Sequence, residues 1–301
     1  MAAAWIAGGE MTSEAAVAAV ATAAASKAVD ASGQPLDIAE AGQRLRSARY
    51  LLLGEIHDNP EHHRLRAEFL RSLLSDGIPT WVVFEQMDRQ HNDAIAAAPR
   101  NTEAVIEAGQ LDRKGWSWPL HRPLFDAALE GGATVVGGNL SRSEGSQVVR
   151  GGASRAPPDL QRLLTNSGDD AASTTTHWTA ALDAELTRQV DEGHCGALPP
   201  DLVAPMALAQ RARDAALASA MMQAPAGTRV VLIAGNGHVR RDIGVPHYLA
   251  ANDARTVSIG VLERAADGTT FVDAPYDEAW FTSGLERPDP CESFRPPGRS
   301  R

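Results

Sequence analysis

Two short segments of the chain carry the residues best suited to chemistry. Each is an apolar run followed by a glycine and, three residues after that glycine, by a histidine. The first is LLLGEIHD, with Gly54 and His57, and the second is VVLIAGNGHVR, with Gly235 and His238. Neutral imidazole binds divalent transition metals and takes part in acid–base catalysis. The repeated spacing therefore predicts two loops that each deliver one histidine to a polar site.

Two carboxylates accompany these histidines. Glu55 lies in the first loop, and Glu85 ends the apolar run TWVVFEQ. A carboxylate that begins close to buried surface either raises its pKa or finds a cation. For Glu85 the alternatives are a metal ligand or general base and a salt bridge to one of the many arginines. For Glu55 and His57 the alternatives are a metal or acid–base pair and a simple cap on the following helix.

These residues follow segments that read as buried strands. We expect strands at Tyr50–Leu53, Trp81–Phe84, Ala133–Gly137, Val230–Ala234 and Thr256–Val261. Helical patterns alternate with them, and Asn59-Pro60-Glu61 is a typical helix start that leads to about Ser75. Such alternation predicts an α/β fold with a mainly parallel sheet flanked by helices. Ligands then bind beyond the carboxyl ends of the strands, so Glu55, His57, Glu85 and His238 are expected to form one site.

The domain organisation follows from changes in composition. Residues 1–35 form an alanine-rich leader that we expect to be disordered, and Glu10 and Glu14 precede its apolar part where a signal peptide is positive. Residues 36–287 form the α/β domain, in which about 143–203 is a loop-rich or helical insert. Helices are expected at 178–192 and 205–222. The tail, residues 288–301, is proline-rich and expected to be irregular.

Charge and composition exclude several classes of protein. The formal net charge of −10 argues against a nucleic-acid partner. No run of 18 apolar residues is present, so no membrane-spanning helix is expected. The two cysteines, Cys195 and Cys291, lack metal-ligand spacing. They are either free thiols or one long-range disulfide in an exported protein.

Other polar and aromatic residues have weaker signals. His62, His63 and His121 are expected to lie on the surface or in helix packing. Trp116 and Trp118 either pack on a flat ligand or anchor their loop. Tyrosine can bind haem iron, but nothing selects among Tyr50, Tyr248 and Tyr276.

A set of ordered motifs resembles a known family. The motifs are GEIHDNPEHHRLRAEFL, VVFEQ, KGWSWPLHRPLFDAAL, GGNLSR, GHCGALPP, PMALAQRARDAALA and VVLIAGNGHVRRDIGVPHYL. Together they span Tyr50 to Leu262 and resemble the ChaN-like family of haem-binding uptake proteins in the TIKI superfamily. The resemblance implies an α/β fold with a helical subdomain, association with the bacterial envelope, and haem or iron uptake. The lipid-attachment cysteine of ChaN-type lipoproteins is not found near Met1, and a cytoplasmic location stays open.

The resemblance leaves three functions to compare. The first is haem binding in the cell envelope, with His57 or His238 near the iron and Arg240 on the propionates. The second is a metal-dependent hydrolase of the TIKI type, in which a divalent ion is held by Glu55, His57, Glu85 and His238. The third is a non-catalytic envelope binding module. The partner is haem or another small molecule, and a homodimer stays open.

Overall fold

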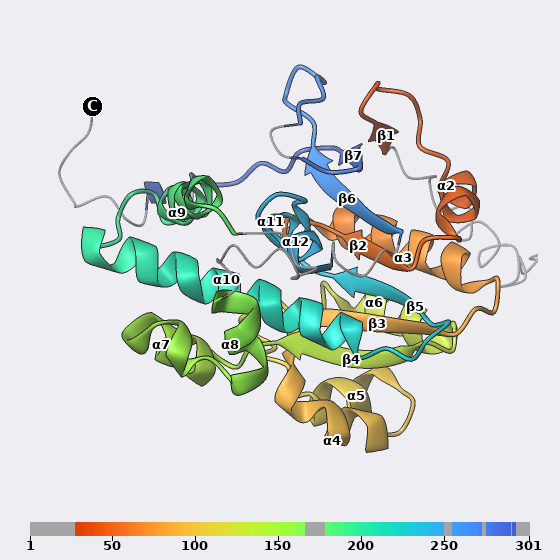
Figure 1. The fold of residues 1–301 in the computed structure, drawn as a ribbon. Coiled ribbons are helices and arrows are strands. Elements are labelled where there is room, and N and C mark those ends of the chain that lie inside the picture. The colour runs from red at the N-terminus through yellow and green to blue at the C-terminus, as the bar shows by residue number, and fades with distance from the viewer. Residues whose placement is uncertain (1–27, 166–177, 250–254, 273–274, 290, 293–301) are drawn as a thin grey trace, which may run out of the picture.

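The structure, a computed structural model, describes residues 28–165, 178–249, 255–272, 275–289 and 291–292. Its centre is a seven-stranded sheet in the order β1-β7-β6-β2-β5-β3-β4 (Figure 1). The strands are β1 (Val29–Asp30), β2 (Tyr50–Leu53), β3 (Thr80–Asp88), β4 (Thr134–Asn139), β5 (Arg229–Ile233), β6 (Thr256–Glu263) and β7 (Glu278–Thr282). All neighbouring pairs are parallel except β1 with β7. The predicted α/β fold with a mainly parallel sheet is confirmed.

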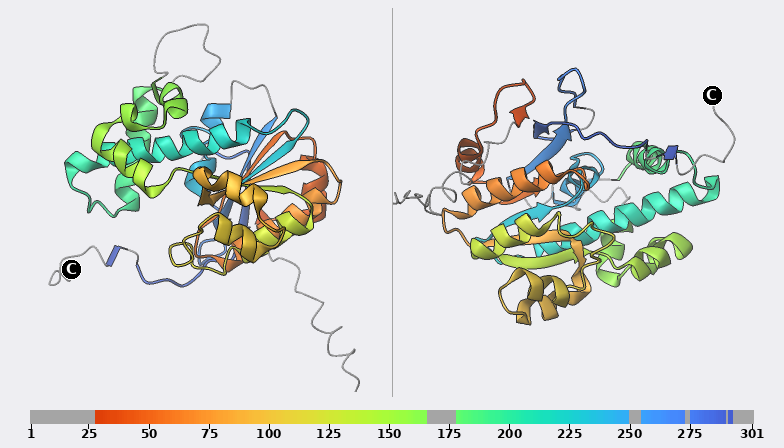
Figure 2. Two further views of the ribbon diagram at one scale, coloured as in Figure 1. Left: turned by 90° about the horizontal axis from the view of Figure 1, so that it is seen from below. Right: turned by 180° about the vertical axis from the view of Figure 1, so that it is seen from behind.

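Helices cover both faces of this sheet. The α-helices are α2 (Ile38–Leu45), α3 (Pro60–Leu74), α4 (Asn92–Ala97), α5 (Thr102–Ala108), α6 (Arg122–Glu130), α7 (Arg142–Gly151), α8 (Pro158–Thr165), α9 (Ala180–Gly193), α10 (Pro200–Met222), α11 (Asn236–Val239) and α12 (Pro246–Leu249). Short 3-10 helices lie at Arg89–His91 and Ala153–Arg155. Helix α10 crosses one face, and the reverse view in Figure 2 brings α3 and α6 to the front. Each face therefore has its own apolar core.

Helix α3 shows how the sequence builds one of these layers. Its N-cap Asn59 accepts hydrogen bonds from the backbone N–H groups of Glu61 and His62, and Pro60 occupies the first turn. Leu65, Phe69 and Leu73 recur at helical spacing and are fully buried against the sheet. The helix follows β2 directly, so its N-terminus lies at the carboxyl end of that strand.

The described parts of the region expected to be an insert, residues 143–165 and 178–203, are largely helical. Helices α7, α8 and α9 pack against α10 beside the sheet. Helix α10 begins at Pro200 and not at Pro205 as predicted, and it contains Pro205. Its buried face is rich in alanine, which lets the neighbouring helices and strands approach closely.

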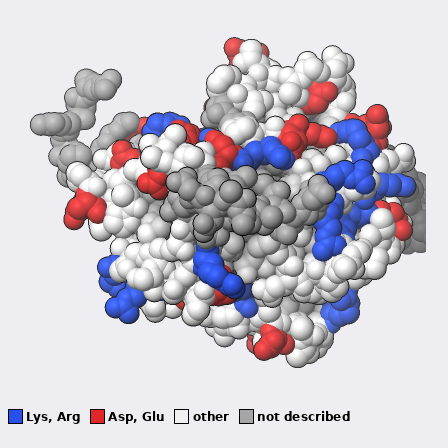
Figure 3. Space-filling view, viewed as in Figure 1, with Lys and Arg blue, Asp and Glu red and all other residues white. Residues whose placement is uncertain are grey.

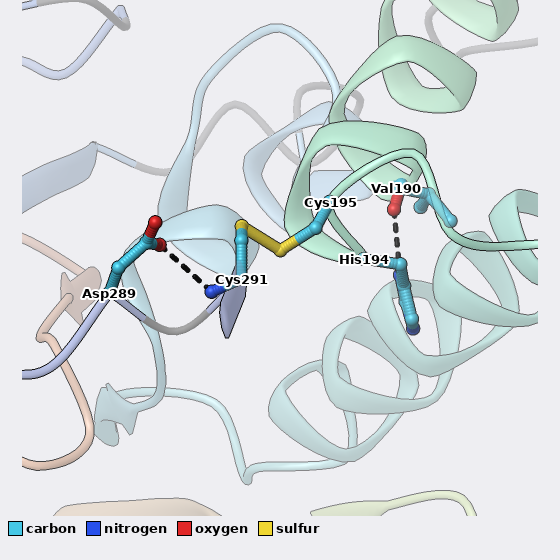
Figure 4. The surroundings of a disulfide bond; sticks show 5 residues. All are labelled: Val190, His194, Cys195, Asp289 and Cys291. Carbon is cyan, nitrogen blue, oxygen red and sulfur yellow. Dashed lines mark hydrogen bonds between the residues drawn. A yellow bond between two sulfur atoms is a disulfide. The ribbon is translucent and has the colours of Figure 1, made fainter. Parts of the chain in front are cut away.

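A disulfide joins the insert to the C-terminal segment. Cys195, just after α9, is bonded to Cys291 (Figure 4). The backbone N–H of Cys291 donates to Asp289 Oδ1 at 2.9 Å, and the His194 ring donates to the Val190 carbonyl at 2.7 Å. Of the two alternatives for the cysteines, the structure has the disulfide.

Two strands were not predicted. Strand β7 lies between β6 and β1, and β1 is the edge strand on this side of the sheet. Strand β1 lies inside the expected leader, of which residues 1–27 fall outside the described part of the chain. The predicted irregular tail likewise lies largely outside it. The remaining strands agree with prediction to within a few residues, and β3 extends through Glu85.

The described surface is mixed in charge. Acidic and basic side chains lie interspersed on the face drawn in Figure 3. Within the described residues, no helix combines the length and the apolar run that crossing a bilayer requires.

Candidate functional site

Three neighbouring strands bring the predicted residues together. Leu53 at the end of β2 pairs with Ile233 of β5, and Ile233 pairs with Phe84 of β3. The residues that follow these three positions therefore emerge side by side at one edge of the sheet. They line a cavity of about 870 Å³ together with parts of the 110–117 loop, β4, α7 and α10. Glu55, His57, Glu85 and His238 are all among its lining residues.

Glycine at both strand ends allows a close approach of the two loops. A side chain at Gly54 would overlap the Asn236 side chain. A Cβ at Gly235 would lie 3.0 Å from His57 Cε1 and 3.1 Å from His57 Nε2. The two Gly-x-x-His segments thus pack against each other, and each glycine makes room for the other loop.

Glu55 is the centre of the first group of polar contacts. It is buried, and its Oε1 lies 2.5 Å from His57 Nδ1 while its Oε2 lies 3.1 Å from Arg66 Nη2. Burial by itself raises the pKa of Glu55, but the Arg66 guanidinium, the nearby His121 ring and the hydrogen bond from His57 hold it well below its usual range. Glu55 is therefore a carboxylate at neutral pH.

Helix α3 supplies the groups that hold this carboxylate. Arg66 is fully buried and donates to the carbonyls of Leu53 and Ala234, at the ends of β2 and β5. Its Nη2 also lies 3.1 Å from His63 Nδ1. Burial lowers the pKa of His63 to about 3, so the ring is neutral and donates from Nε2 to the His57 carbonyl at 2.9 Å.

Both histidines at the start of α3 are buried, so the surface alternative for them is wrong and the packing alternative is right. Burial lowers the pKa of His62 to about 4. Its Nδ1 accepts from the Ile56 N–H at 3.0 Å and its Nε2 bonds to Thr282 at 2.9 Å. His62 thereby ties the first loop to β7.

His57 is the accessible member of the first group. Its side chain is 51% exposed, although its Nδ1 is held by Glu55. Burial lowers the pKa of His57, but the hydrogen bond to Glu55 and the charge of Glu85 outweigh it and raise the pKa. A proton on Nδ1 leaves Nε2 as the nitrogen that can accept or coordinate.

Glu85, His238 and Asp214 form a second, buried group. His238 Nδ1 lies 2.6 Å from Asp214 Oδ1, and His238 Nε2 lies 3.2 Å from Glu85 Oε1. The other oxygen of Glu85 accepts from the Gly235 N–H at 2.8 Å. Burial lowers the pKa of His238, but the two carboxylates outweigh it and raise the pKa to about 10. His238 is therefore an imidazolium with both nitrogens engaged.

The two carboxylates of this group differ. Burial raises the pKa of Asp214 to about 6 against the opposing effect of His238. For Glu85 the charges of His238 and His57 and the Gly235 N–H outweigh burial and lower the pKa to about 2. Glu85 thus carries the negative charge that faces the cavity, whereas Asp214 lies behind His238.

His121 also belongs to the site, which the sequence did not reveal. It is fully buried and lines the cavity, with Nδ1 donating to the Trp116 carbonyl at 3.1 Å. Its Nε2 has no hydrogen-bond partner among the described residues and lies 3.7 Å from Glu55 Oε1. One ligand atom each from Glu55, His57 and His121 lies within 4.8 Å of the others, a spacing that suits a metal ion.

Trp116 packs edge-on against both His57 and His121, with ring centroids 5.0 and 5.6 Å apart. Trp118 packs instead on Phe125 in the core beneath the loop. Of the two tryptophans, only Trp116 lines the cavity.

Several other candidates lie outside the cavity. The Arg240 guanidinium pairs with Asp242 and Glu185, at 2.7 and 3.1 Å, and Arg240 is not a lining residue. None of the three tyrosines lines the cavity either. The arginines that do line it are Arg142, at the start of α7, and Arg213, whose Nη1 donates to Asn139 at 3.2 Å.

Fold and site together define an α/β protein with carboxylate–histidine pairs in a cavity at the carboxyl ends of parallel strands. The chain belongs to the family described as haem-binding uptake, Tiki superfamily, ChaN, whose sequence model matches residues 41–249. No curated protein matches the chain.

A solved structure with the family's fold agrees with this assignment at the level of the fold. The structure described as cofacial heme binding to ChaN of Campylobacter jejuni has a TM-score of 0.64 and 18% identity, and covers 85% of this chain and 96% of that one. An erythromycin esterase mutant, EreC, in its open conformation has a TM-score of 0.41 and 15% identity, covering 77% and 74%. RRSP, a MARTX toxin effector domain from Vibrio vulnificus CMCP6, has a TM-score of 0.40 and 14% identity, covering 78% and 37%. The last two scores carry no functional argument.

Proposed function

We propose that the protein binds haem in this cavity, with His57 as the iron ligand. One observation carries the proposal. Three histidines line the cavity, and their side chains are 51% exposed for His57, 1% for His121 and 8% for His238. Only His57 combines an accessible ring with a nitrogen left over for coordination, because both nitrogens of His238 face carboxylates.

The surroundings of His57 fit an iron ligand. A ligating histidine normally donates its other ring N–H to a carboxylate or carbonyl, which fixes the ring and raises its basicity. Glu55 occupies that position at 2.5 Å, and Arg66 holds Glu55 in turn. Proximal histidine is a common haem ligand.

The cavity also offers groups that suit the propionates and the ring of haem. Its volume of about 870 Å³ lies in the usual range for cofactor sites. Arg142 and Arg213 supply positive charge for propionates, in place of Arg240. Ile56, Trp116 and Leu140 supply apolar surface for the ring.

A role in haem or iron uptake at the cell envelope completes this proposal. It is supported by the family and by the Cys195–Cys291 disulfide, since such bonds persist in exported proteins.

A haem titration followed by absorption tests the proposal. We expect a saturable Soret shift at micromolar haem in the wild type and its loss in His57→Ala. His194→Ala is the matched control, because His194 lies beside the disulfide and away from the cavity. A wild type without a Soret shift, or a His57→Ala variant that binds equally well, contradicts haem binding at this site.

A second candidate is a metal-dependent hydrolase that uses the same edge of the sheet. It is favoured by the unpaired Nε2 of His121 beside Glu55 and His57. These three residues would hold a divalent ion that activates water, with Glu85 as the spare carboxylate base. His238 is not in this set, because its nitrogens are engaged.

Metal analysis separates the two candidates. A hydrolase site predicts near-stoichiometric divalent metal in the purified protein and its loss in both His57→Ala and His121→Ala. Haem binding through His57 predicts that His121→Ala keeps the Soret shift. A protein that binds neither metal nor haem would be a non-catalytic binding module.

A further inference from the structure

Buried polar atoms without a partner gather around the cavity. Across the residues that the structure describes, six buried side-chain nitrogen or oxygen atoms lack a hydrogen bond, and four of them belong to lining residues. One is Glu55 Oε2, one is His121 Nε2, and two are the oxygen and nitrogen of the Gln86 amide. Buried polar groups are otherwise almost always paired. Glu55 Oε2 still has its ion pair with Arg66, so His121 Nε2 and the Gln86 amide are the lining atoms that the described part of the chain leaves without a polar partner.

Gln86 differs from the other two residues. It lies on β3 next to Glu85 and is only 3% exposed. Glu85 and Gln86 both line the cavity. Glu85 bonds to His238 and to the Gly235 N–H, whereas the Gln86 amide makes no hydrogen bond in the described structure. Glu55 and His121 are ionic or metal-binding groups, but an uncharged amide is explained by neither a metal ion nor an ion pair.

We infer that Gln86 marks a subsite for the carboxamide group of a small molecule. A glutamine amide presents an acceptor and a donor side by side in one plane. Its complement must place a donor opposite the oxygen and an acceptor opposite the nitrogen, which a second carboxamide does. A carboxylate offers acceptors only, and it would also meet the negative charges of Glu55 and Glu85. Haem propionates therefore do not satisfy Gln86, and the subsite is independent of the proposed haem binding.

Gln86 reaches such a ligand by turning its side chain. The amide atoms are closed off from solvent as they stand. Rotation about the side-chain bonds breaks no hydrogen bond of the amide, because it makes none in the described structure. Trp116 is half-buried in the same cavity and offers a ring against which a flat ligand can pack. An aromatic carboxamide is thus a suitable probe.

Binding of benzamide to the haem-free protein tests the inference. We expect saturable binding in calorimetry or ligand-observed NMR, and affinity for benzoate at least tenfold weaker, because sites built around hydrogen-bonding groups reject analogues that leave them unpaired. This comparison uses the wild type alone and does not depend on any variant. No saturable binding of benzamide, or benzoate binding as tightly, overturns the inference.

The residue is tested by Gln86→Met, which keeps the length of the side chain and removes both polar atoms. We expect at least a tenfold rise in the Kd for benzamide and an unchanged or higher Tm, since an unpaired buried amide is lost. Gln90→Met is the matched control, because Gln90 is exposed and is not a lining residue of the cavity, and the Kd of that variant for benzamide should stay within twofold of the wild type. A Gln86→Met variant with wild-type affinity, or with a Tm lowered by several degrees, shows a structural glutamine and overturns the assignment.

The haem titration of Gln86→Met keeps the two proposals apart. The Soret shift should be that of the wild type. Benzamide binding in a protein that fails to bind haem leaves the carboxamide subsite standing, and the reverse result leaves haem binding standing.

Discussion

Glu55 Oε1 lies 2.5 Å from His57 Nδ1, and this contact joins a fully buried carboxylate to a half-exposed imidazole. The carboxylate is itself fixed from behind by Arg66, which also binds the ends of β2 and β5. The ring of His57 is thus oriented by the frame of the sheet, and its Nε2 is left for the cavity.

The orientation of His57 by Glu55 can be tested by Glu55→Gln. The amide keeps the size of the side chain but lacks the charge that raises the basicity of the imidazole. We expect affinity for haem to fall by about 10–100-fold, the usual effect of losing a group that orients a ligand. A haem titration measures it, with Glu68→Gln as the control on the exposed face of α3. Equal affinity in Glu55→Gln and wild type contradicts the role given to Glu55.

The raised pKa of His57 predicts a pH dependence of binding. Below this pKa the ring carries a second proton on Nε2, which blocks coordination. Affinity should therefore fall about tenfold for each pH unit below the pKa and be constant above it. Loss of the Glu55 charge in Glu55→Gln lowers the pKa of His57 and moves the break to lower pH. Titrations from pH 5 to pH 9 locate the break. A break at the same or a higher pH in Glu55→Gln would falsify the assignment of this break to His57.

Gly235 packs closely on the His57 ring, so a larger residue at this position tests whether a ligand reaches His57 Nε2 from this side. In Gly235→Ala the new methyl group lies 3.0–3.1 Å from the Cε1 and Nε2 atoms of His57. We expect at least a tenfold loss of haem or metal affinity with the fold retained. Gly237→Ala is the matched control, because a Cβ there meets nothing within 4 Å. Equal binding by the two variants would show that the ligand does not approach His57 from this side.

The buried imidazolium of His238 predicts a pH-dependent stability. Removing it in His238→Ala leaves Glu85 and Asp214 without a cation and should cost about 3–5 kcal/mol of unfolding free energy. Since the pKa is raised from 6.5 to about 10, this stabilisation is complete below about pH 6.5 and is lost as the pH rises toward 10. Urea unfolding at pH 6.5, 8 and 9.5 measures it. In His238→Gln the unfolding free energy should decline less over this pH range than in the wild type. An equal decline in the two proteins rules out His238 as the source of the pH dependence.

The disulfide predicts both a mass and a stability. The non-reduced protein should be two hydrogen atoms lighter than the reduced one. The double variant Cys195→Ala, Cys291→Ala should lose about 2–5 kcal/mol of unfolding free energy, because the bond closes a loop with a sequence separation of 96. Two alkylated thiols in protein isolated from its native host without reductant would contradict the bond, and with it the envelope location.

Much of the site could be predicted because it depends on strand ends. Three apolar runs, two of which break at a glycine, placed Glu55, His57, Glu85 and His238 at one edge of a parallel sheet, and all four line one cavity. The order of the strands could not be predicted. The expectation of one shared site assumed only that the strands run in the same direction, and it was met because β2, β5 and β3 are neighbours in the sheet.

The rest depends on contacts between distant elements, which periodicity does not encode. His121 reaches the site from a loop. The sequence does not distinguish Arg66 from an exposed arginine of an amphipathic helix, and Arg66 becomes buried only because α3 packs on the sheet. Asp214 offered one signal, a carboxylate within an alanine-rich helix that must be buried. Arg240 follows His238 closely in the sequence but turns to Asp242 and Glu185. Strand β7 is short and follows a loop, so its apolar residues did not form a recognisable pattern.

Rescue of a His57→Gly variant by free imidazole tests the central proposal most directly. The deletion leaves space beside Glu55 for an imidazole molecule to take the place of the lost ring. We predict that His57→Gly loses the Soret shift of the wild type and regains it when millimolar imidazole is added together with haem. A His57→Gly variant that binds haem with the wild-type spectrum and affinity in the absence of imidazole would contradict the account.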